Sequence, residues 1–237
     1  MSVKLVVFDL AGTTVKDNND VSKAFQSALK KYGYSVPLDL INPIMGYEKT
    51  EAITKMLHTH EPDASKITDS LVRDIHTTFV REMIDHYSFA GTIESLPDVE
   101  ETFAALREMG IQVGINTGFS RDIADAIINR LQWREKDLID HLVGSDEVPQ
   151  GRPFPFMIEK MMKEGNIADA NDVVKVGDTE VDVREGQNTG CRFVIGVTTG
   201  AFSREGLETY HPTHIIDNIA EVLEIIKSKA DATGEPS

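Results

Sequence analysis

Short apolar runs alternate with amphipathic segments over most of the chain, and this alternation predicts its fold. The first run, residues 3–8, is typical of a central parallel strand that is buried on both faces. Four further runs follow residue 110 and read IQVGI, HLVG, VVKVG and FVIGV. Each is followed by a segment with helical spacing, which is the pattern of a doubly wound parallel sheet. The sequence therefore predicts an α/β fold.

One long segment interrupts this alternation. No strand-like run occurs from Val21 to about Ser88, where apolar residues follow helical spacing, as in VSKAFQSALKKYG and ITDSLVRDIHTTFVREMIDHY. This segment is predicted to be a helical insert in the α/β core. The expected parts are a core domain of residues 1–14 and 89–230, a helical domain of residues 15–88, and a frayed tail of residues 231–237.

Composition and charge limit the classes of function. The chain has 24 Lys and Arg against 39 Asp and Glu, and a net charge of -15 disfavours nucleic acid or an acidic membrane as a partner. No apolar run approaches the length of about 20 residues that a membrane-spanning helix needs. Cys191 is the single cysteine, so no intramolecular disulfide can form. We expect a soluble cytoplasmic protein that needs local positive charge or a metal to bind an anion.

Polar side chains stand at the predicted strand ends, where open parallel sheets bind ligands. Asp9 ends the first run, Thr117 and Gly118 follow the second, and Asp178 follows the fourth, with Asp182 one helical turn later. Carboxylates together with backbone carbonyls suit Mg²⁺, which also accepts phosphate oxygens from a substrate. The pattern therefore indicates a magnesium site.

Arg152 lies between the last two sets of strand-end residues. Its guanidinium group, with the Thr117 hydroxyl and the Gly118 amide, would donate to the remaining phosphate oxygens. Together these groups indicate phosphoryl transfer. The plainer alternatives are a turn cap for Asp9, a helix cap near Ser120 for Thr117, a surface position for Arg152, and a pair stabilised by the helix dipole for Asp178 and Asp182.

Four segments in order, FDLAGTT, INTGF, GRPFP and VGDTEVD, resemble the four motifs of the haloacid dehalogenase superfamily. The resemblance covers most of the chain and implies a Rossmann-like core with an inserted helical cap, Mg²⁺ as cofactor, and an aspartyl-phosphate intermediate on Asp9. Within the superfamily, MGYEK and GRPFP are similar to segments of phosphonatase-like hydrolases, the family of phosphonoacetaldehyde hydrolase. Ala11 also fits that family, because ordinary phosphatases have a second aspartate there that protonates the departing alkoxide.

The resemblance also implies the roles of individual residues. The catalytic residues would be Asp9, Lys49 and Arg152. The substrate would be bound by Ala11, Gly12, Thr13, Met45, Gly46, Thr117, Gly118 and Phe119. The metal would be held by Asp9, Ala11, Asp178 and Asp182, with Ala11 acting through its backbone carbonyl. The expected partners are a small phosphonate or phosphate metabolite and a second copy of the chain that pairs through the cap.

Lys49 would explain how a carbon–phosphorus bond can break. Carbon leaves with an electron pair only if the negative charge is delocalised, and an iminium between Lys49 and a neighbouring aldehyde provides such a sink. The amine must then be partly neutral near pH 7, although the pKa of a free lysine is about 10.4. Burial by a closed cap and a cation such as Arg152 would lower that pKa. In the alternative, Lys49 only contacts a substrate phosphate.

Three departures from phosphonatases that act on phosphonoacetaldehyde leave the substrate open. Ala52 replaces a histidine, Phe119 a tyrosine and Asn19 a cysteine. The favoured function is cleavage of phosphonoacetaldehyde or a similar carbonyl phosphonate. A phosphatase for a small metabolite, such as phosphoglycolate or a sugar phosphate, is the alternative. A phosphate-binding regulatory protein with weak catalysis is a third function, and intact Asp9, Arg152 and Asp178 argue against it.

Overall fold

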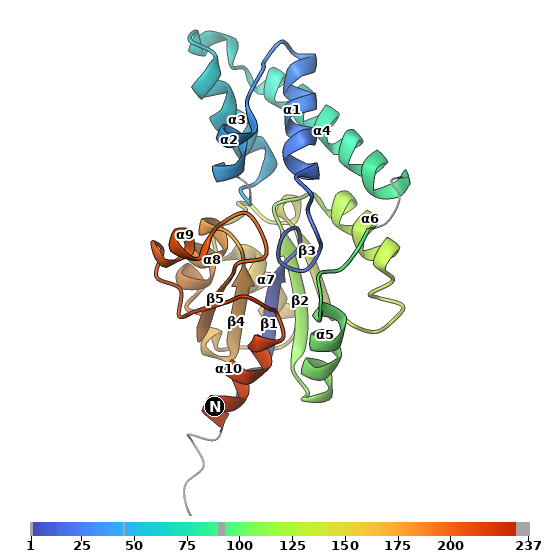
Figure 1. Ribbon diagram of the computed structural model, residues 1–237, viewed down its shortest axis with the longest axis vertical. Helices are drawn as coiled ribbons and strands as arrows, with labels where there is room; N and C mark the ends of the chain where they lie inside the picture. Colours follow the sequence, from blue (N-terminus) through green and yellow to red (C-terminus); the bar gives the residue numbers. More distant parts are fainter. Residues whose placement is uncertain (1, 45, 90–92, 231–237) are drawn as a thin grey trace, which may run out of the picture.

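The computed structural model describes residues 2–44, 46–89 and 93–230. In these residues, six strands form one parallel sheet in the order β3-β2-β1-β4-β5-β6 (Figure 1). The strands are β1 (Leu5–Asp9), β2 (Gln112–Thr117), β3 (His141–Gly144), β4 (Val173–Gly177), β5 (Phe193–Val197) and β6 (His214–Ile216). The chain moves outward from β1 in both directions, which is the doubly wound arrangement. The predicted fold class is confirmed.

Helices cover both faces of this sheet and the carboxyl ends of its strands. The helices are α1 (Asp20–Lys31), α2 (Leu38–Ile41), α3 (Lys49–His60), α4 (Asp69–Phe89), α5 (Val99–Glu108), α6 (Arg121–Leu131), α7 (Phe156–Glu164), α8 (Glu180–Thr189), α9 (Arg204–Glu208) and α10 (Glu221–Ala230). Short 3₁₀ turns span Asn42–Ile44, Ala64–Lys66, Ser145–Glu147 and Ala170–Asp172. Among the described helices, none is long and apolar enough to cross a bilayer.

Alternate residues of the central strand pack on opposite faces of the sheet. Val6 and Phe8 belong to the large buried cluster that includes α5, α6 and α10, and the Phe8 ring lies 5.0 Å from that of Phe103 in α5. Leu5 and Val7 pack instead with the apolar side of α7. Every residue of β1 is buried, which explains why the strand is continuously apolar from Leu5 to Phe8 rather than alternating.

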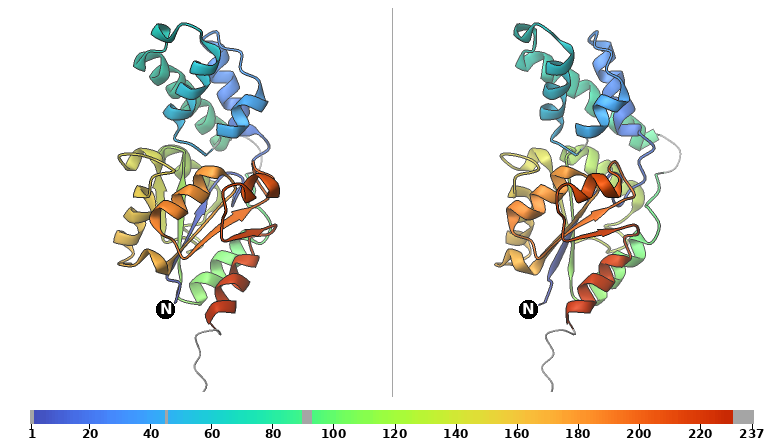
Figure 2. Two further views of the ribbon diagram at one scale, coloured as in Figure 1. Left: turned by 90° about the vertical axis from the view of Figure 1, so that its left-hand side faces the viewer. Right: turned by 60° about the vertical axis from the view of Figure 1, so that its left-hand side comes forward.

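Helices α1 to α4 form a separate group beyond the carboxyl ends of the strands (Figures 1 and 2). We call residues 20–89 the helical insert. Its centre is apolar, with the rings of Phe25 in α1 and Phe79 in α4 stacked 4.2 Å apart. Helix α4 also packs against α6 of the sheet layer. The insert is thus placed over the edge of the sheet where parallel strands present their ligand-binding groups.

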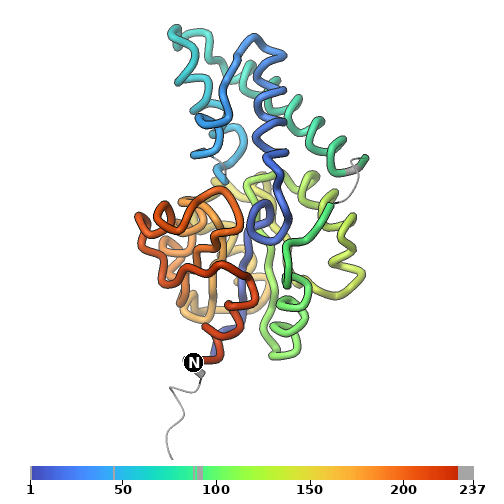
Figure 3. Tube along the Cα trace, viewed as in Figure 1, coloured from blue at the N-terminus to red at the C-terminus, as the bar shows by residue number. Residues whose placement is uncertain are grey.

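Residues 14–16 and 94–96, which belong to the two connections between the core and the helical insert, run side by side (Figure 3). The Lys16 amide donates to the Glu94 carbonyl at 3.1 Å, and the Leu96 amide donates to the Thr14 carbonyl at 2.9 Å. A segment that leaves the core and one that returns to it are therefore joined at one place. The division into two domains at residues 15 and 88 stays a prediction, and residues 231–237 lie outside the described residues.

Candidate functional site

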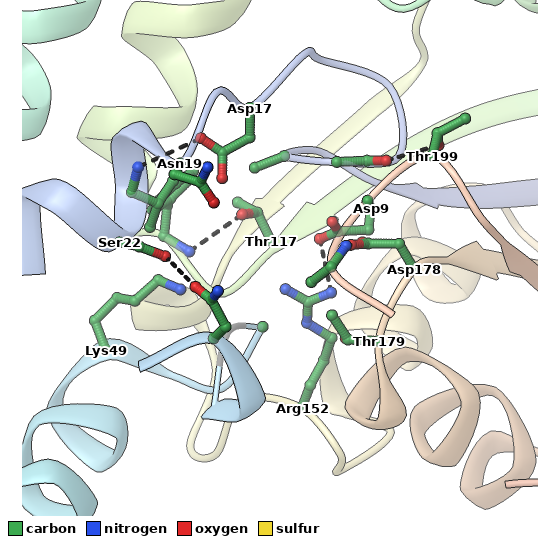
Figure 4. Close-up of a pocket in the computed structure, with 18 residues that line it drawn as sticks. Asp9, Asp17, Asn19, Ser22, Lys49, Thr117, Arg152, Asp178, Thr179 and Thr199 are labelled. Carbon is green, nitrogen blue, oxygen red and sulfur yellow. Dashed lines mark hydrogen bonds and ion pairs between the residues drawn. The ribbon is translucent and has the colours of Figure 1, made fainter. Parts of the chain in front are cut away.

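A cavity of about 180 Å³ lies between the carboxyl ends of the strands and the helical insert (Figure 4). The predicted site residues that line it are Asp9, Ala11, Gly12, Gly46, Lys49, Thr117, Phe119, Arg152 and Asp178. The predicted residues Thr13, Gly118 and Asp182 contact this lining from behind. Met45 lies outside the described residues. Pockets for drug-sized ligands usually measure about 300–1,000 Å³, so this one suits a small metabolite.

The turn after β1 brings backbone groups close to a carboxylate. Gly12 has φ +89°, and a Cβ atom there would lie 2.7 Å from Oδ2 of Asp178. The Thr14 hydroxyl donates to the Asp9 carbonyl at 2.9 Å and secures the turn. A side chain at position 12 would be strained and would collide with Asp178, so glycine is required here.

Three buried carboxylates meet at this turn. Asp9, Asp178 and Asp182 each offer an oxygen, and these oxygens all lie within 4.8 Å of one another. Burial, followed by the charges of Asp9 and Asp182, raises the pKa of Asp178 to about 8. The Thr13 hydroxyl at 3.0 Å and the Ala201 amide at 2.6 Å hold the Asp178 carboxylate in place. A cluster of buried oxygen ligands whose charges repel one another fits a hard divalent cation.

Arg152 links two of these carboxylates. Its Nη1 donates to Oδ1 of Asp9 at 2.7 Å and also to Asp182. Burial opposes ionisation of Asp182, but Arg152 and Lys175 outweigh it and lower its pKa to about 2. The buried Nε of Arg152 has no hydrogen-bond partner among the described residues. Arg152 also lines the cavity, so its guanidinium group can donate to a phosphate oxygen there.

Asp182 has a second structural role. Its carboxylate accepts from the Thr179 amide at 3.2 Å and from the Thr179 hydroxyl, which forms a capping box at the start of α8. Asp182 therefore stabilises the first turn of α8, as the plainer alternative predicted, and it also belongs to the acidic cluster.

Lys49, the first residue of α3, reaches the same cavity from the helical insert (Figure 4). Its side chain is buried, and its Nζ lies 5.0 Å from the ring centre of Phe119 and 5.6 Å from that of Phe25. Burial, followed by the charge of Arg152, lowers the pKa of Lys49 to about 8. Both causes were expected from the sequence. Glu48 accepts from the Thr50 amide at 3.0 Å, so its carboxylate serves as the helix cap.

A buried polar network behind the cavity was missed in the sequence. Lys175 of β4 lies 3.0 Å from Asp182 and 3.2 Å from Glu185, and it donates to Oδ1 of Asn116 at 2.6 Å. Asn116 in turn donates to Glu185 at 2.8 Å. A signal was present, because a lysine inside the apolar run VVKVG needs a buried partner. Glu185 follows Asp182 by three residues and so shares its helix face.

Further lining residues come from the helical insert and its first linker, among them Asp17, Ser22 and Asn42. No motif or spacing marks them in the sequence. They come together only because the 3₁₀ turn at Asn42–Ile44 packs beside the start of α1, where the Ser22 hydroxyl donates to Oδ1 of Asn42 at 2.9 Å.

Comparison with known proteins agrees with this geometry. A family model described as haloacid dehalogenase-like hydrolase matches residues 6–196, which hold all four motifs. The chain belongs to the haloacid dehalogenase-like hydrolases. Among curated proteins, this hydrolase is 30% identical to phosphonoacetaldehyde hydrolase of Bacillus cereus, over 97% of this chain and 88% of the relative. It is 28% identical to the protein of the same name from Bacillus anthracis, over the same shares.

Solved structures show the same fold. A phosphonoacetaldehyde hydrolase-like protein from Oleispira antarctica has a TM-score of 0.80 at 22% identity, covering 100% of this chain and 96% of its own. A predicted phosphoglycolate phosphatase from Haemophilus somnus has a TM-score of 0.76 at 21% identity, covering 94% of this chain and 97% of its own. The haloacid dehalogenase-like fold of this hydrolase is thus confirmed over nearly its whole length.

Proposed function

We propose that this hydrolase cleaves the carbon–phosphorus bond of phosphonoacetaldehyde or a similar carbonyl phosphonate, with Mg²⁺ and an aspartyl-phosphate intermediate on Asp9. The observation that carries the proposal is Lys49, a buried lysine with its pKa lowered to about 8 that lines the same cavity as Asp9. Relatives that are 28% and 30% identical carry the name phosphonoacetaldehyde hydrolase, which supports it.

The first step is imine formation. With a pKa of about 8, about one Lys49 amine in ten is neutral at pH 7, against about one in 2,500 for a free lysine. The neutral amine attacks the carbonyl carbon of the substrate, water leaves, and a protonated imine forms. This cation lies two bonds from phosphorus, where it can accept the electron pair of the carbon–phosphorus bond.

Asp9 then attacks phosphorus. The carbon–phosphorus bond breaks, its electron pair moves into the iminium to give an enamine, and the phosphoryl group stays on Asp9. The Arg152 contact fixes the Asp9 carboxylate for this attack, and the guanidinium group of Arg152 donates to the phosphoryl oxygens. Because the leaving group is an enamine, no acid is needed at Ala11. Protonation of the enamine at carbon and hydrolysis of the imine release the carbonyl product, and water releases phosphate from Asp9.

The metal has a defined place in this scheme. Asp9, Asp178 and Asp182, with the Ala11 carbonyl, would hold Mg²⁺, which would neutralise charge on the phosphoryl oxygens. The helical insert would act as the cap that brings Lys49 to the substrate and excludes water during phosphoryl transfer.

A phosphatase for a small phosphorylated metabolite is the second candidate. The faces of Phe25 and Phe119 lie over the Lys49 amine, and aromatic faces stabilise an ammonium group. A charged Lys49 would contact a substrate phosphate instead of forming an imine. Ala11 opposes this reading, because the alkoxide leaving group of a phosphate ester needs an acid at that position.

Borohydride trapping separates the two candidates. Borohydride added during turnover of phosphonoacetaldehyde should reduce the imine and leave a stable adduct on Lys49, visible by peptide mass. Lys49→Arg keeps the charge but forms no imine, so it should lose carbon–phosphorus cleavage. Asp9→Asn should still form the adduct but release no phosphate. If no adduct forms and Lys49→Arg hydrolyses phosphate esters at the wild-type rate, the enzyme is a phosphatase.

A further inference from the structure

The cavity has a second polar surface, opposite the phosphate-binding groups. Asp17 and Ser22 lie across the cavity from Asp178 and Arg152 in Figure 4, and Asn42 lines the same side through its contact with Ser22. We call Asp17, Ser22 and Asn42 the polar wall. A phosphoryl group bound at Asp178 and Arg152 would direct the carbon chain of the substrate toward Lys49 and this wall.

Asp17 presents an acceptor to the cavity. Its Oδ1 accepts from the Asp20 amide at 2.7 Å and from the Val21 amide at 3.4 Å, at the start of α1. Both contacts use one oxygen, so Oδ2 can accept from a ligand. The same carboxylate repels a negatively charged group on the carbon chain of a substrate.

Asn42 supplies a matching donor. Its carboxamide oxygen accepts from the Ser22 hydroxyl at 2.9 Å, and this hydrogen bond does not use the NH₂ group of the amide. Ser22 is only 2% exposed, and the hydrogen bond from its hydroxyl fixes the orientation of the Asn42 amide. Closing a cavity over an amide and a carboxylate is costly unless the ligand forms hydrogen bonds with them.

These groups fit one kind of substituent. We propose that the substrate carries a hydroxyl group on the carbon beyond its carbonyl, and that the polar wall selects for it. A hydroxyl can donate to the carboxylate of Asp17 or accept from the amide of Asn42, whereas a methyl group does neither and a carboxylate is repelled by Asp17. The position of the carbonyl at Lys49 rests on the proposed function. The substrate class is therefore a hydroxylated carbonyl phosphonate, one carbon longer than phosphonoacetaldehyde.

Binding of unreactive phosphonates tests this without any turnover. Three probes of equal chain length differ only at the third carbon: 3-hydroxypropylphosphonate, propylphosphonate and 3-phosphonopropionate. Calorimetric titration with Mg²⁺ should show that the hydroxyl compound binds about tenfold more tightly than the propyl compound, as one net hydrogen bond provides. The carboxylate compound should bind most weakly. Equal or tighter binding of propylphosphonate would overturn the proposal.

Substitutions in the polar wall test whether it causes the preference for the hydroxyl compound. Asn42→Leu keeps the size of the side chain and should abolish the preference for the hydroxyl compound, and Ser22→Ala should reduce it. Ser27→Ala is the matched control on the same helix, where the hydroxyl contacts Glu82 at 3.1 Å outside the cavity, and it should leave the preference intact. Asp17→Asn gives a second readout. It removes the negative charge that repels a carboxylate, so 3-phosphonopropionate should bind more tightly. If the preference persists in Asn42→Leu, the proposal fails, whatever borohydride trapping shows at Lys49.

Discussion

Lys49 combines burial with a cationic neighbour, and this gives the reaction a predictable dependence on pH. If a neutral amine starts the reaction, kcat/KM for a carbonyl phosphonate should rise with pH through about 8 and level off above it, because the pKa of Lys49 is lowered to about 8. The rate of borohydride trapping on Lys49 should follow the same curve. A profile that is flat between pH 7 and 9 would contradict this role.

The lowered pKa of Lys49 also determines whether the free energy of unfolding rises or falls with pH. The pKa of Lys49 falls from 10.5 to about 8 on folding, so between these values the unfolded chain binds more protons than the folded one. The free energy of unfolding should therefore rise with pH across this window, relative to a Lys49→Met variant that lacks the group. This comparison is the control for the kinetic profile.

Individual residues differed in how far the sequence could reveal them. Asp9 and Lys49 stand within motifs, because the chemistry requires a fixed residue next to a turn or a helix start. Ser22 and Asn42 are 20 positions apart and meet only through the packing of the helical insert. Lys175 was detectable as a charge within an apolar strand, but its partners depend on how α8 lies against the sheet.

At the scale of elements, the buried network of Lys175 ties β4 to α8. Lys175→Met should lower the free energy of unfolding by about 3–5 kcal/mol, because it removes the buried cation beside Glu185 and leaves Asp182 with Arg152 alone. The matched control is Lys160→Met, which removes an exposed pair with Glu164 and should cost about 0–1 kcal/mol. Urea denaturation measures the free energy of unfolding of both variants. Equal losses would show that the buried network stabilises the fold no more than an exposed ion pair does.

A second prediction concerns the contact between the helical insert and the loop after β2. A Cβ atom on Gly118 would lie 2.6 Å from the Tyr47 carbonyl and 2.8 Å from that of Gly46. Gly118→Ala should push the backbone of Gly46 and Tyr47 away and displace Lys49, which follows them in the chain. Because displacement by about 1 Å can cost about 10²-fold in rate, we expect kcat/KM to fall by that order.

The control for this contact is Gly206→Ala in α9. A Cβ atom there would have its nearest neighbour at 3.5 Å, an ordinary contact, so activity should be unchanged. If Gly118→Ala also keeps full activity, the insert does not need to pack on this loop for catalysis.

Strands could be predicted from the sequence where they are buried along their whole length. The strands from β1 to β5 are buried along nearly their whole length, so continuous apolar runs marked them. Strand β6 (His214–Ile216) was missed because it has three residues, two of them only half-buried, at the edge of the sheet. A strand of that length has no periodicity to recognise.

At the scale of the whole molecule, a net charge of -15 has to be reconciled with an anionic substrate. The positive charge needed is local: Arg152 and Lys49 line the cavity, and Lys175 lies just behind it. These cations are offset by the three clustered carboxylates, so the proposed divalent cation would make the cavity attractive to the proposed phosphonate. Substrate affinity should therefore depend on the metal more than on the overall charge.

The last prediction concerns the effect of metal binding on the stability of the fold. An ion that binds only the folded protein stabilises it by about 2.7 kcal/mol at 100 times its Kd, which for a chain of this size raises Tm by about 5–10 °C. Mg²⁺ should produce such a rise in the wild type and much less in Asp178→Ala, which lacks one of the three clustered carboxylates. NaCl at matched ionic strength is the control, because screening of a strongly acidic surface also stabilises the fold. An equal rise in both proteins would mean that Mg²⁺ acts on the surface and not at the cluster of Asp9, Asp178 and Asp182.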